Sequence, residues 1–274
     1  MGKKLLHLIW FVRKIIKGTK NMEVKDYKRK ITHRDYGKAE AGLQQYAHGV
    51  DKVITEIPRA VKLDDIKPKE VFTQVNQKFI ILYYAAKVLP HMAGGVALAM
   101  IIMFLIPSDE EWTFMPIIIF SISCIAFVFF AVYLFTMPKK EHILNREDGL
   151  ITFTGFYWQA NVTMPFENVI FSYSTGGEDE TGSFMLQVIR PTKGHAFDLF
   201  GAGNGDCYRD ISFITWYMDK NRPLPPGDAF DKYRLQDFER RKAEGFPRPL
   251  YPSNIPTPEA TPEQQAEREK IGGW

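Results

Sequence analysis

The chain has 274 residues, with 35 Lys and Arg against 32 Asp and Glu, so its net charge is only +3. The charges are unevenly distributed, because residues 1–78 carry 18 basic and 9 acidic side chains whereas residues 138–274 carry 16 and 20. Neither cysteine, Cys124 or Cys207, has a second Cys or a spaced His nearby, which excludes a zinc or redox motif. The basic part lacks a helix-turn-helix pattern and an aromatic-basic platform, so we expect no nucleic-acid partner.

Residues 3–17 carry apolar side chains at helical spacing among basic ones. Such a helix can lie in a membrane interface, with Trp10 and Phe11 inserted and Lys14 at the headgroups. Packing against the rest of the protein is the alternative. A signal peptide is disfavoured because Arg13 and Lys14 interrupt the apolar run and no small-residue cleavage site follows.

Two further helices are predicted before the first long apolar stretch. Residues 39–57 place apolar side chains on one stripe that Pro58 ends. The second helix begins at Pro68, which is tolerated in a first helical turn, and continues into the apolar stretch. Residues 1–78 therefore form, on this interpretation, one basic N-terminal arm.

Residues 79–137 contain two apolar stretches joined by a short acidic hinge at 108–111. A bilayer core needs roughly 20 apolar residues of helix, and both stretches meet that length. We predict a transmembrane hairpin with spans at about 85–106 and 113–136. Two buried helices of a soluble core are the alternative.

Charge predicts the orientation of this hairpin. The hinge carries three acids and no Lys or Arg, whereas Lys78 and Lys87 flank the first stretch and Lys139 and Lys140 follow the second. Short basic flanks stay in the cytoplasm, so both termini are expected inside, with Trp112, Lys139 and Lys140 at the membrane interface. Gly94–Gly95 would let a second hairpin approach, so a homo-oligomer stays open.

After Pro138 the pattern changes from helical to alternating. A domain at 138–222 is predicted to be α+β, with an antiparallel, strongly bent sheet or partly open barrel capped by a C-terminal helix. Its expected elements are strands at 142–146, 150–154, 156–163, 169–173, 184–190 and 196–200 and a helix at 206–220.

Residues 223–274 form a tail with nine prolines. Most of it is expected to be extended, wrapped on its own domain or on a partner, or disordered. A short helix is predicted at 235–243. Another helix start is predicted at Thr261, with Gln264 in the reciprocal capping position.

The strongest local candidate for chemistry is Gly201–Gly205, a glycine-rich run between a strand and a helix, where amides could bind a phosphate. It lacks the spacing of a dinucleotide or P-loop motif, and a plain loop is the alternative. His195 and Asp198 lie three apart in a strand pattern, on opposite faces. Recognised catalytic motifs are missing, so we expect neither catalysis, nor a cofactor, nor a metal.

Three segments carry a resemblance: Leu144–Gly149, Met164–Val169 and Leu224–Pro226. They resemble a proteobacterial family of two-span inner-membrane proteins with a cytoplasmic pleckstrin-homology-like (PH-like) domain, often encoded near secreted toxins. The resemblance covers about residues 79–228. It implies a multi-pass inner-membrane protein that acts as an immunity protein, neutralising a toxin or secretion-system effector by protein–protein recognition. It supplies no catalytic residues.

The predicted partner-binding residues are Glu178, Asp179 and Glu180 of an acidic loop, together with Trp158. Core packing is the alternative for Trp158. Two other functions stay open on the sequence alone. One is a lipid-binding or membrane-organising module, and the other is a transport or secretion accessory subunit, although the spans carry no mid-membrane charge.

Overall fold

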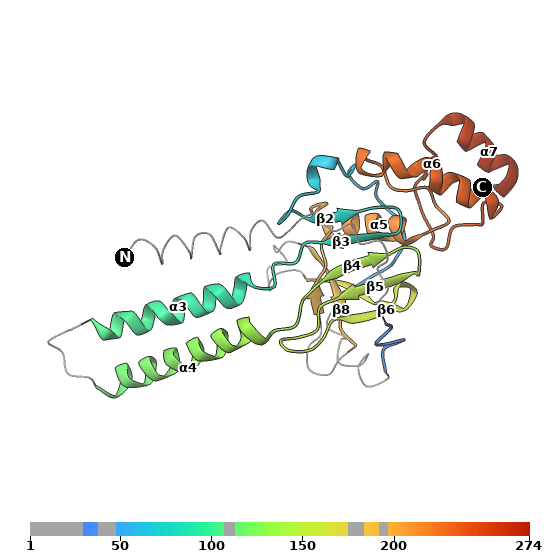
Figure 1. Cartoon of the computed structure of the whole chain (residues 1–274). Helices are drawn as coiled ribbons and strands as arrows, with labels where there is room; N and C mark the ends of the chain where they lie inside the picture. The colour runs from blue at the N-terminus through green and yellow to red at the C-terminus, as the bar shows by residue number, and fades with distance from the viewer. Residues whose placement is uncertain (1–29, 38–47, 107–112, 175–183, 192–196) are drawn as a thin grey trace.

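The structure, a computed structural model, describes residues 30–37, 48–106, 113–174, 184–191 and 197–274. Its described part consists of a long helical hairpin and a mixed domain of helices and antiparallel sheets (Figure 1). The hairpin projects from one end of the domain, and the chain's last two helices lie at the opposite end.

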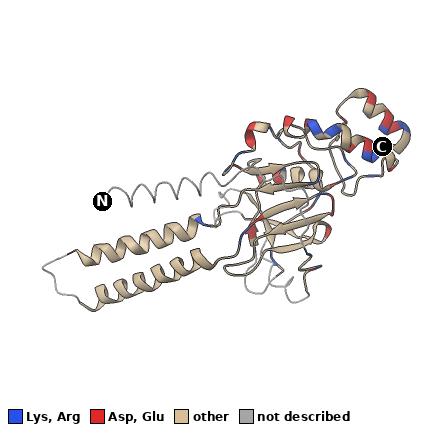
Figure 2. Ribbon diagram, viewed as in Figure 1, with Lys and Arg blue, Asp and Glu red and all other residues tan. Residues whose placement is uncertain are grey.

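The hairpin is formed by α3 (Val88–Leu105) and α4 (Phe114–Thr136), which lie side by side. Both helices are long and apolar enough to cross a membrane, and neither contains a charged residue (Figure 2). Gly94 lets them approach closely, because a Cβ atom there would lie 3.4 Å from the Cβ of Phe130. The prediction of two long apolar helices is confirmed, at nearly the predicted bounds.

The first sheet has five antiparallel strands in the order β2-β3-β4-β5-β6. The hairpin is inserted between its second and third strands, and these two strands pair directly with each other, from Phe79 opposite Asn145 to Leu82 opposite His142. The strands are β2 (Phe72–Val75), β3 (Phe79–Leu82), β4 (His142–Asn145), β5 (Leu150–Phe153) and β6 (Val162–Pro165).

The helix predicted from Pro68 into the first apolar stretch is therefore wrong. Residues 72–75 and 79–82 are strands, and Asn76 turns the chain between them by accepting hydrogen bonds from the amides of Lys78 and Phe79. The apolar side chains in this segment fit helical spacing, but β-branched and aromatic residues also favour strands. The deciding contact is with β4, which lies beyond the hairpin in the chain. The sheet domain thus includes residues on both sides of the hairpin.

The second sheet has the order β1-β7-β8-β9, again antiparallel throughout. Its strands are β1 (His48–Val50), β7 (Phe171–Ser174), β8 (Met185–Ile189) and β9 (Phe197–Leu199). The described end of the helix predicted at 39–57 is also wrong, because residues 48–50 form β1 and Ile54 bridges to Ser253. Val50 and Ile54 are buried by these pairings rather than on a helical stripe.

Helix α5 (Cys207–Met218) packs against β8 and β4, one strand of each sheet, and confirms the helix predicted at 206–220. Asp206 caps it by accepting a hydrogen bond from the amide of Arg209. The strands predicted after Pro138 are confirmed apart from 156–163, where only residues 162 and 163 belong to a strand, β6. The core between the sheets and α5 is apolar and continuous. Its largest members include Phe72, Phe153, Phe166, Phe171, Phe213 and Tyr217.

The tail is folded onto the domain and is not disordered. It contains α6 (Asp228–Ala243) and α7 (Pro262–Gly272), so the helix predicted at 235–243 is confirmed as part of a longer one. Thr261 caps α7 as predicted, by accepting a hydrogen bond from the amide of Gln264. Buried ion pairs hold the tail together: Glu259 binds both Arg241 and Arg268. A prediction of disorder from proline content alone therefore fails here, because these prolines lie before, between and at the start of ordered helices.

Candidate functional site at the base of the hairpin

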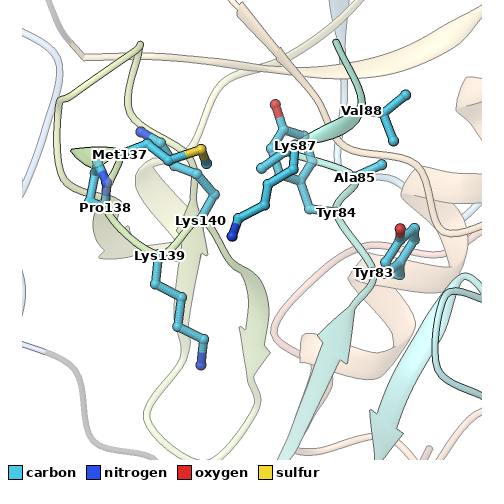
Figure 3. A pocket seen from close by; sticks show the side chains of 10 residues that line it. Tyr83, Tyr84, Ala85, Lys87, Val88, Met137, Pro138, Lys139 and Lys140 are labelled. Atoms are coloured by element: carbon cyan, nitrogen blue, oxygen red, sulfur yellow. The ribbon is translucent and has the colours of Figure 1, made fainter. Parts of the chain in front are cut away.

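Two short connections, which we call the neck segments, join the hairpin to the first sheet. Residues 83–87 lead from β3 to α3, and residues 137–141 lead from α4 to β4. A cavity of about 460 Å³, the neck cavity, lies between them (Figure 3). The two neck segments continue from β3 and β4, which pair with each other, so the cavity lies at the end of the first sheet.

Three lysines line the neck cavity: Lys87, Lys139 and Lys140. Lys87 extends into the space between the two segments, whereas Lys139 points away from it (Figure 3) and pairs with Glu141. Lys140 donates hydrogen bonds to the carbonyl oxygens of Gly155 at 2.7 Å and Gln159 at 2.6 Å. The structure thus brings both lysines that the sequence assigned to the membrane interface to the base of the hairpin.

The ammonium group of Lys140 is partly removed from water. Burial lowers its pKa to about 8, and the nearby charge of Arg190 acts in the same direction, while Asp198 opposes it. An ammonium group has three hydrogen-bond donors, and the two carbonyls use two of them. Among the residues that the structure describes, the third donor of Lys140 has no hydrogen-bond partner.

Behind Lys140 lies a buried polar cluster centred on Asp198. Its carboxylate accepts hydrogen bonds from the amide of Thr154 at 2.8 Å and from the hydroxyl of Thr154 at 2.7 Å. It also pairs with His142 and Arg190, each at 3.0 Å. These residues join β4 and β5 of one sheet to β9 of the other.

Burial alone would raise the pKa of Asp198. The hydrogen bond and charge of His142, with the charge of Arg190, outweigh this effect and lower the pKa below its ordinary value. The cluster is therefore held together by an ionised carboxylate. Sequence reasoning missed it, because His142 and Asp198 are far apart in the chain and meet only when the two sheets pack.

A second cavity of about 540 Å³, the basal cavity, adjoins the neck cavity, and Lys140 lines both. The polar lining of the basal cavity comes from the sheet domain and consists of Lys140, Thr154, Arg190 and Asp198. Apolar side chains are contributed by both helices of the hairpin, a loop and an edge strand. Its apolar lining includes Leu89, Pro90, Ala93, Phe130, Phe156, Tyr157, Phe197 and Leu199.

Trp158 lies in the 155–160 loop, which runs along the last turns of α4. Its indole Nε1 donates a hydrogen bond to the hydroxyl of Thr136 at 2.7 Å, and its ring contacts Phe129 and Tyr133 edge-on. The side chain is 44% exposed, so it is neither core nor free surface. Its predicted partner-binding role stays a prediction.

The other predicted site residues lie outside the described residues. These are Glu178, Asp179 and Glu180 of the acidic loop, and Trp10, Phe11, Lys14 and Trp112 of the predicted membrane interface.

The glycine-rich run at 201–205 faces carboxylates of its own chain. The amide and side chain of Asn204 donate to Asp210, and the carboxylate of Asp206 already caps the helix that follows. Two carboxylates at this helix start disfavour an anion. Within the described ranges, no group of three or more His, Cys, Asp or Glu could hold a metal ion.

Comparison of the chain with protein-family models, with curated proteins and with solved structures returned no match. The site is therefore interpreted from its geometry.

Proposed function

We propose that this chain is an integral membrane protein whose hairpin spans the bilayer and holds a PH-like domain against the cytoplasmic surface, where the domain binds another component without catalysis. The exposed apolar side chains of the hairpin support insertion. Leu89, Phe114 and Phe135 are 75%, 76% and 90% exposed, and they continue along both helices. Soluble proteins rarely expose apolar patches larger than a few hundred Å².

The observation that carries this proposal is the direct pairing of β3 with β4 across the hairpin. Two helices that follow neighbouring strands through short connections leave the same end of the five-stranded sheet. With the helices in a bilayer, the neck and basal cavities face the lipid headgroups. The lysines of the neck favour the cytoplasmic side, because short basic flanks are retained there.

The strand order supports a PH-like fold. Strands β3 to β6 follow one another in one sheet, β7 to β9 follow in the other, and α5 comes next and packs against both. Four strands, three strands and a C-terminal helix are the parts of a PH-like domain. On this interpretation β1 and β2 are additions at the sheet edges, and the hairpin replaces the first strand connection.

The non-enzymatic part of the proposal is supported by the way the buried His–Asp pair is used. His142 is 3% exposed, and its partner Asp198 is fully engaged by Thr154 and Arg190. The cluster therefore acts as a structural joint between the sheets. A protein partner, and in particular a toxin that the chain neutralises as an immunity protein, is the narrower prediction and rests on the sequence resemblance.

Cysteine labelling tests the membrane arrangement. Native Cys207 is fully buried and Cys124 lies within α4, so the wild-type protein serves as the unlabelled control. A membrane-impermeant maleimide should label Asp109→Cys in the hinge in intact spheroplasts. It should label Lys67→Cys in the domain only after the membrane is opened. The reverse pattern would overturn the orientation, and release of the protein by alkaline carbonate would overturn membrane insertion.

The narrower immunity prediction needs a separate experiment. The chain should restore growth to cells that express a neighbouring toxin gene, and a complex of the two proteins should be recovered in mild detergent. Growth arrest in the presence of the well-expressed chain would contradict it.

A further inference from the structure

We propose that the basal cavity holds one anionic glycerophospholipid of the surrounding bilayer, with its phosphate at Lys140 and one acyl chain against α3 and α4. This inference rests on the proposed membrane insertion of the hairpin. It assigns a defined lipid site to a cavity that is built jointly by the helices and the sheet domain.

The lining of the basal cavity offers contacts for both parts of a lipid. Lys140 lies in a neck segment, where a bilayer would place its headgroups, and other lining residues lie in the first turns of α3 and the last turns of α4. Apolar side chains also come from the domain itself. Phe197 and Leu199 of the edge strand β9 are 51% and 43% exposed, and both line the cavity. An acyl chain between the strand and the helices would remove them from water.

The positive charge of the lysines at the cavity favours an anionic ligand. In the described part of the chain no carboxylate lies within 4.0 Å of the Lys140 ammonium group. The acidic residue that lines the cavity, Asp198, is already paired with His142 and Arg190. Lys87 adds a second positive charge from the adjoining neck cavity. A phosphate oxygen would take the third donor of Lys140, and a charge-assisted hydrogen bond is the strong kind.

The position and size of the cavity favour a lipid over other occupants. Basic pockets between membrane helices on the cytoplasmic side bind anionic lipid headgroups. A volume of about 540 Å³ lies within the ordinary range of small-molecule sites. A protein side chain would have to reach the cavity through the headgroup layer, whereas a lipid is already there.

Lipid retention by the purified full-length protein tests the proposal. After extraction in a mild detergent and reconstitution into nanodiscs with phosphatidylglycerol and phosphatidylcholine, we expect about one phosphatidylglycerol per chain to survive detergent washing, measured by native mass spectrometry. Lys140→Met should weaken this retention about tenfold or more. Lys139→Met is the matched control, since it removes the same charge from the preceding residue, which does not line the basal cavity, and it should retain the lipid.

Two further variants keep the test decisive if Lys140→Met folds poorly. Lys140→Arg keeps the charge and should keep the lipid. Ala93→Phe adds a large ring to the apolar lining of the cavity and should reduce retention while both lysines remain. Equal retention in Lys140→Met and Lys139→Met, or equal retention of phosphatidylcholine, would overturn the site. Displacement of the lipid by millimolar glycerol phosphate alone would show that the acyl chain is not held.

Absence of the lipid site can be distinguished from absence of membrane insertion. A protein that resists carbonate extraction and carries no bound phosphatidylglycerol would be a membrane protein without this site. A protein that carbonate releases would remove the basis of both proposals.

Discussion

Ile81 of β3 lies directly opposite Ile143 of β4, although the whole helical hairpin separates them in the chain. The entropy of closing a loop grows only slowly with its length, so a long insertion between two paired strands is tolerated. The hairpin is therefore an insertion within one domain and not a separator between two.

Removing the hairpin should leave a folded, soluble domain. We expect a variant in which residues 86–138 are replaced by a short Gly-containing turn to remain monomeric, because Leu82 and His142 already lie opposite each other at the strand ends. Gel filtration and near-ultraviolet circular dichroism without detergent are the measurements. The same variant with Ile80→Asp, at a fully buried position, is the unfolded control. Recovery of only aggregated protein from the first variant would contradict this prediction.

Asp198→Asn should destabilise the domain by about 3 kcal/mol, because it removes a buried carboxylate that pairs with both His142 and Arg190. Urea unfolding of the hairpin-free domain measures this change. The double substitution Asp198→Asn with Arg190→Met should cost less than the sum of the two single ones, since both members of the pair are then replaced. Strictly additive effects of the two substitutions would contradict the pairing.

The same carboxylate predicts the acid behaviour of the domain. The pKa of Asp198 is lowered on folding, so its contribution to stability is complete above the ordinary pKa of an aspartate and is lost as the pH falls through the lower folded value. We expect unfolding curves between pH 5 and pH 3 to show a smaller loss of stability in Asp198→Asn than in the wild type. Identical curves would exclude Asp198 as the group that titrates.

Lys52 predicts a further rise of stability with pH, now on the alkaline side. It donates a hydrogen bond to the carbonyl of Glu167 at 2.8 Å, and burial lowers its pKa from 10.5 to about 8. Between these two values the unfolded chain binds more protons than the folded one, so stability should rise with pH. Lys52→Met should show a smaller rise than the wild type between pH 7.5 and pH 9.5 in urea unfolding. Lys140, with the same shift, contributes in the same direction.

The raised pKa of Tyr36, about 12, opposes this trend only above pH 10. The raised pKa of the buried Cys207 thiol opposes the trend within the chosen window, so the comparison of Lys52→Met with the wild type is what isolates the lysine. An equal change of stability in the two proteins across the window would contradict the prediction.

Gly94 and Gly95 should respond differently to a large side chain. A Cβ atom at Gly94 meets Phe130 at 3.4 Å, whereas nothing lies within 4 Å of one at Gly95. Gly94→Leu should therefore separate α3 from α4 and lower the melting temperature in detergent, while Gly95→Leu should leave it nearly unchanged. A larger effect at Gly95 would indicate that this glycine faces a second copy of the chain.

The sequence predicted best those elements that depend on their own residues. The hairpin helices follow from two uncharged apolar stretches, and α5 follows from its apolar stripe and from the cap at Asp206. Thr261 likewise marks the start of α7, because a capping side chain accepts its hydrogen bond from an amide within the next three residues.

The elements that were missed depend on distant partners. Phe72, Val75 and Phe79 satisfy helical spacing, and only the presence of β4 beyond the hairpin makes their segment a pair of strands. The joint between His142 and Asp198 requires two sheets to meet, and the ordered tail requires buried pairs such as Arg241 with Glu259. None of these pairings leaves a local pattern in the chain.

The insertion of the hairpin between β3 and β4 sets the order of events during synthesis. Strands β2 and β3 leave the ribosome first, and their partner β4 follows only after both helices have been made. At about 5–20 residues per second, this delay lasts several seconds. The edge of β3 that pairs with β4 stays open throughout this delay, so both helices emerge from the ribosome before the sheet closes. A completed sheet therefore exists only on a chain whose hairpin has already been synthesised.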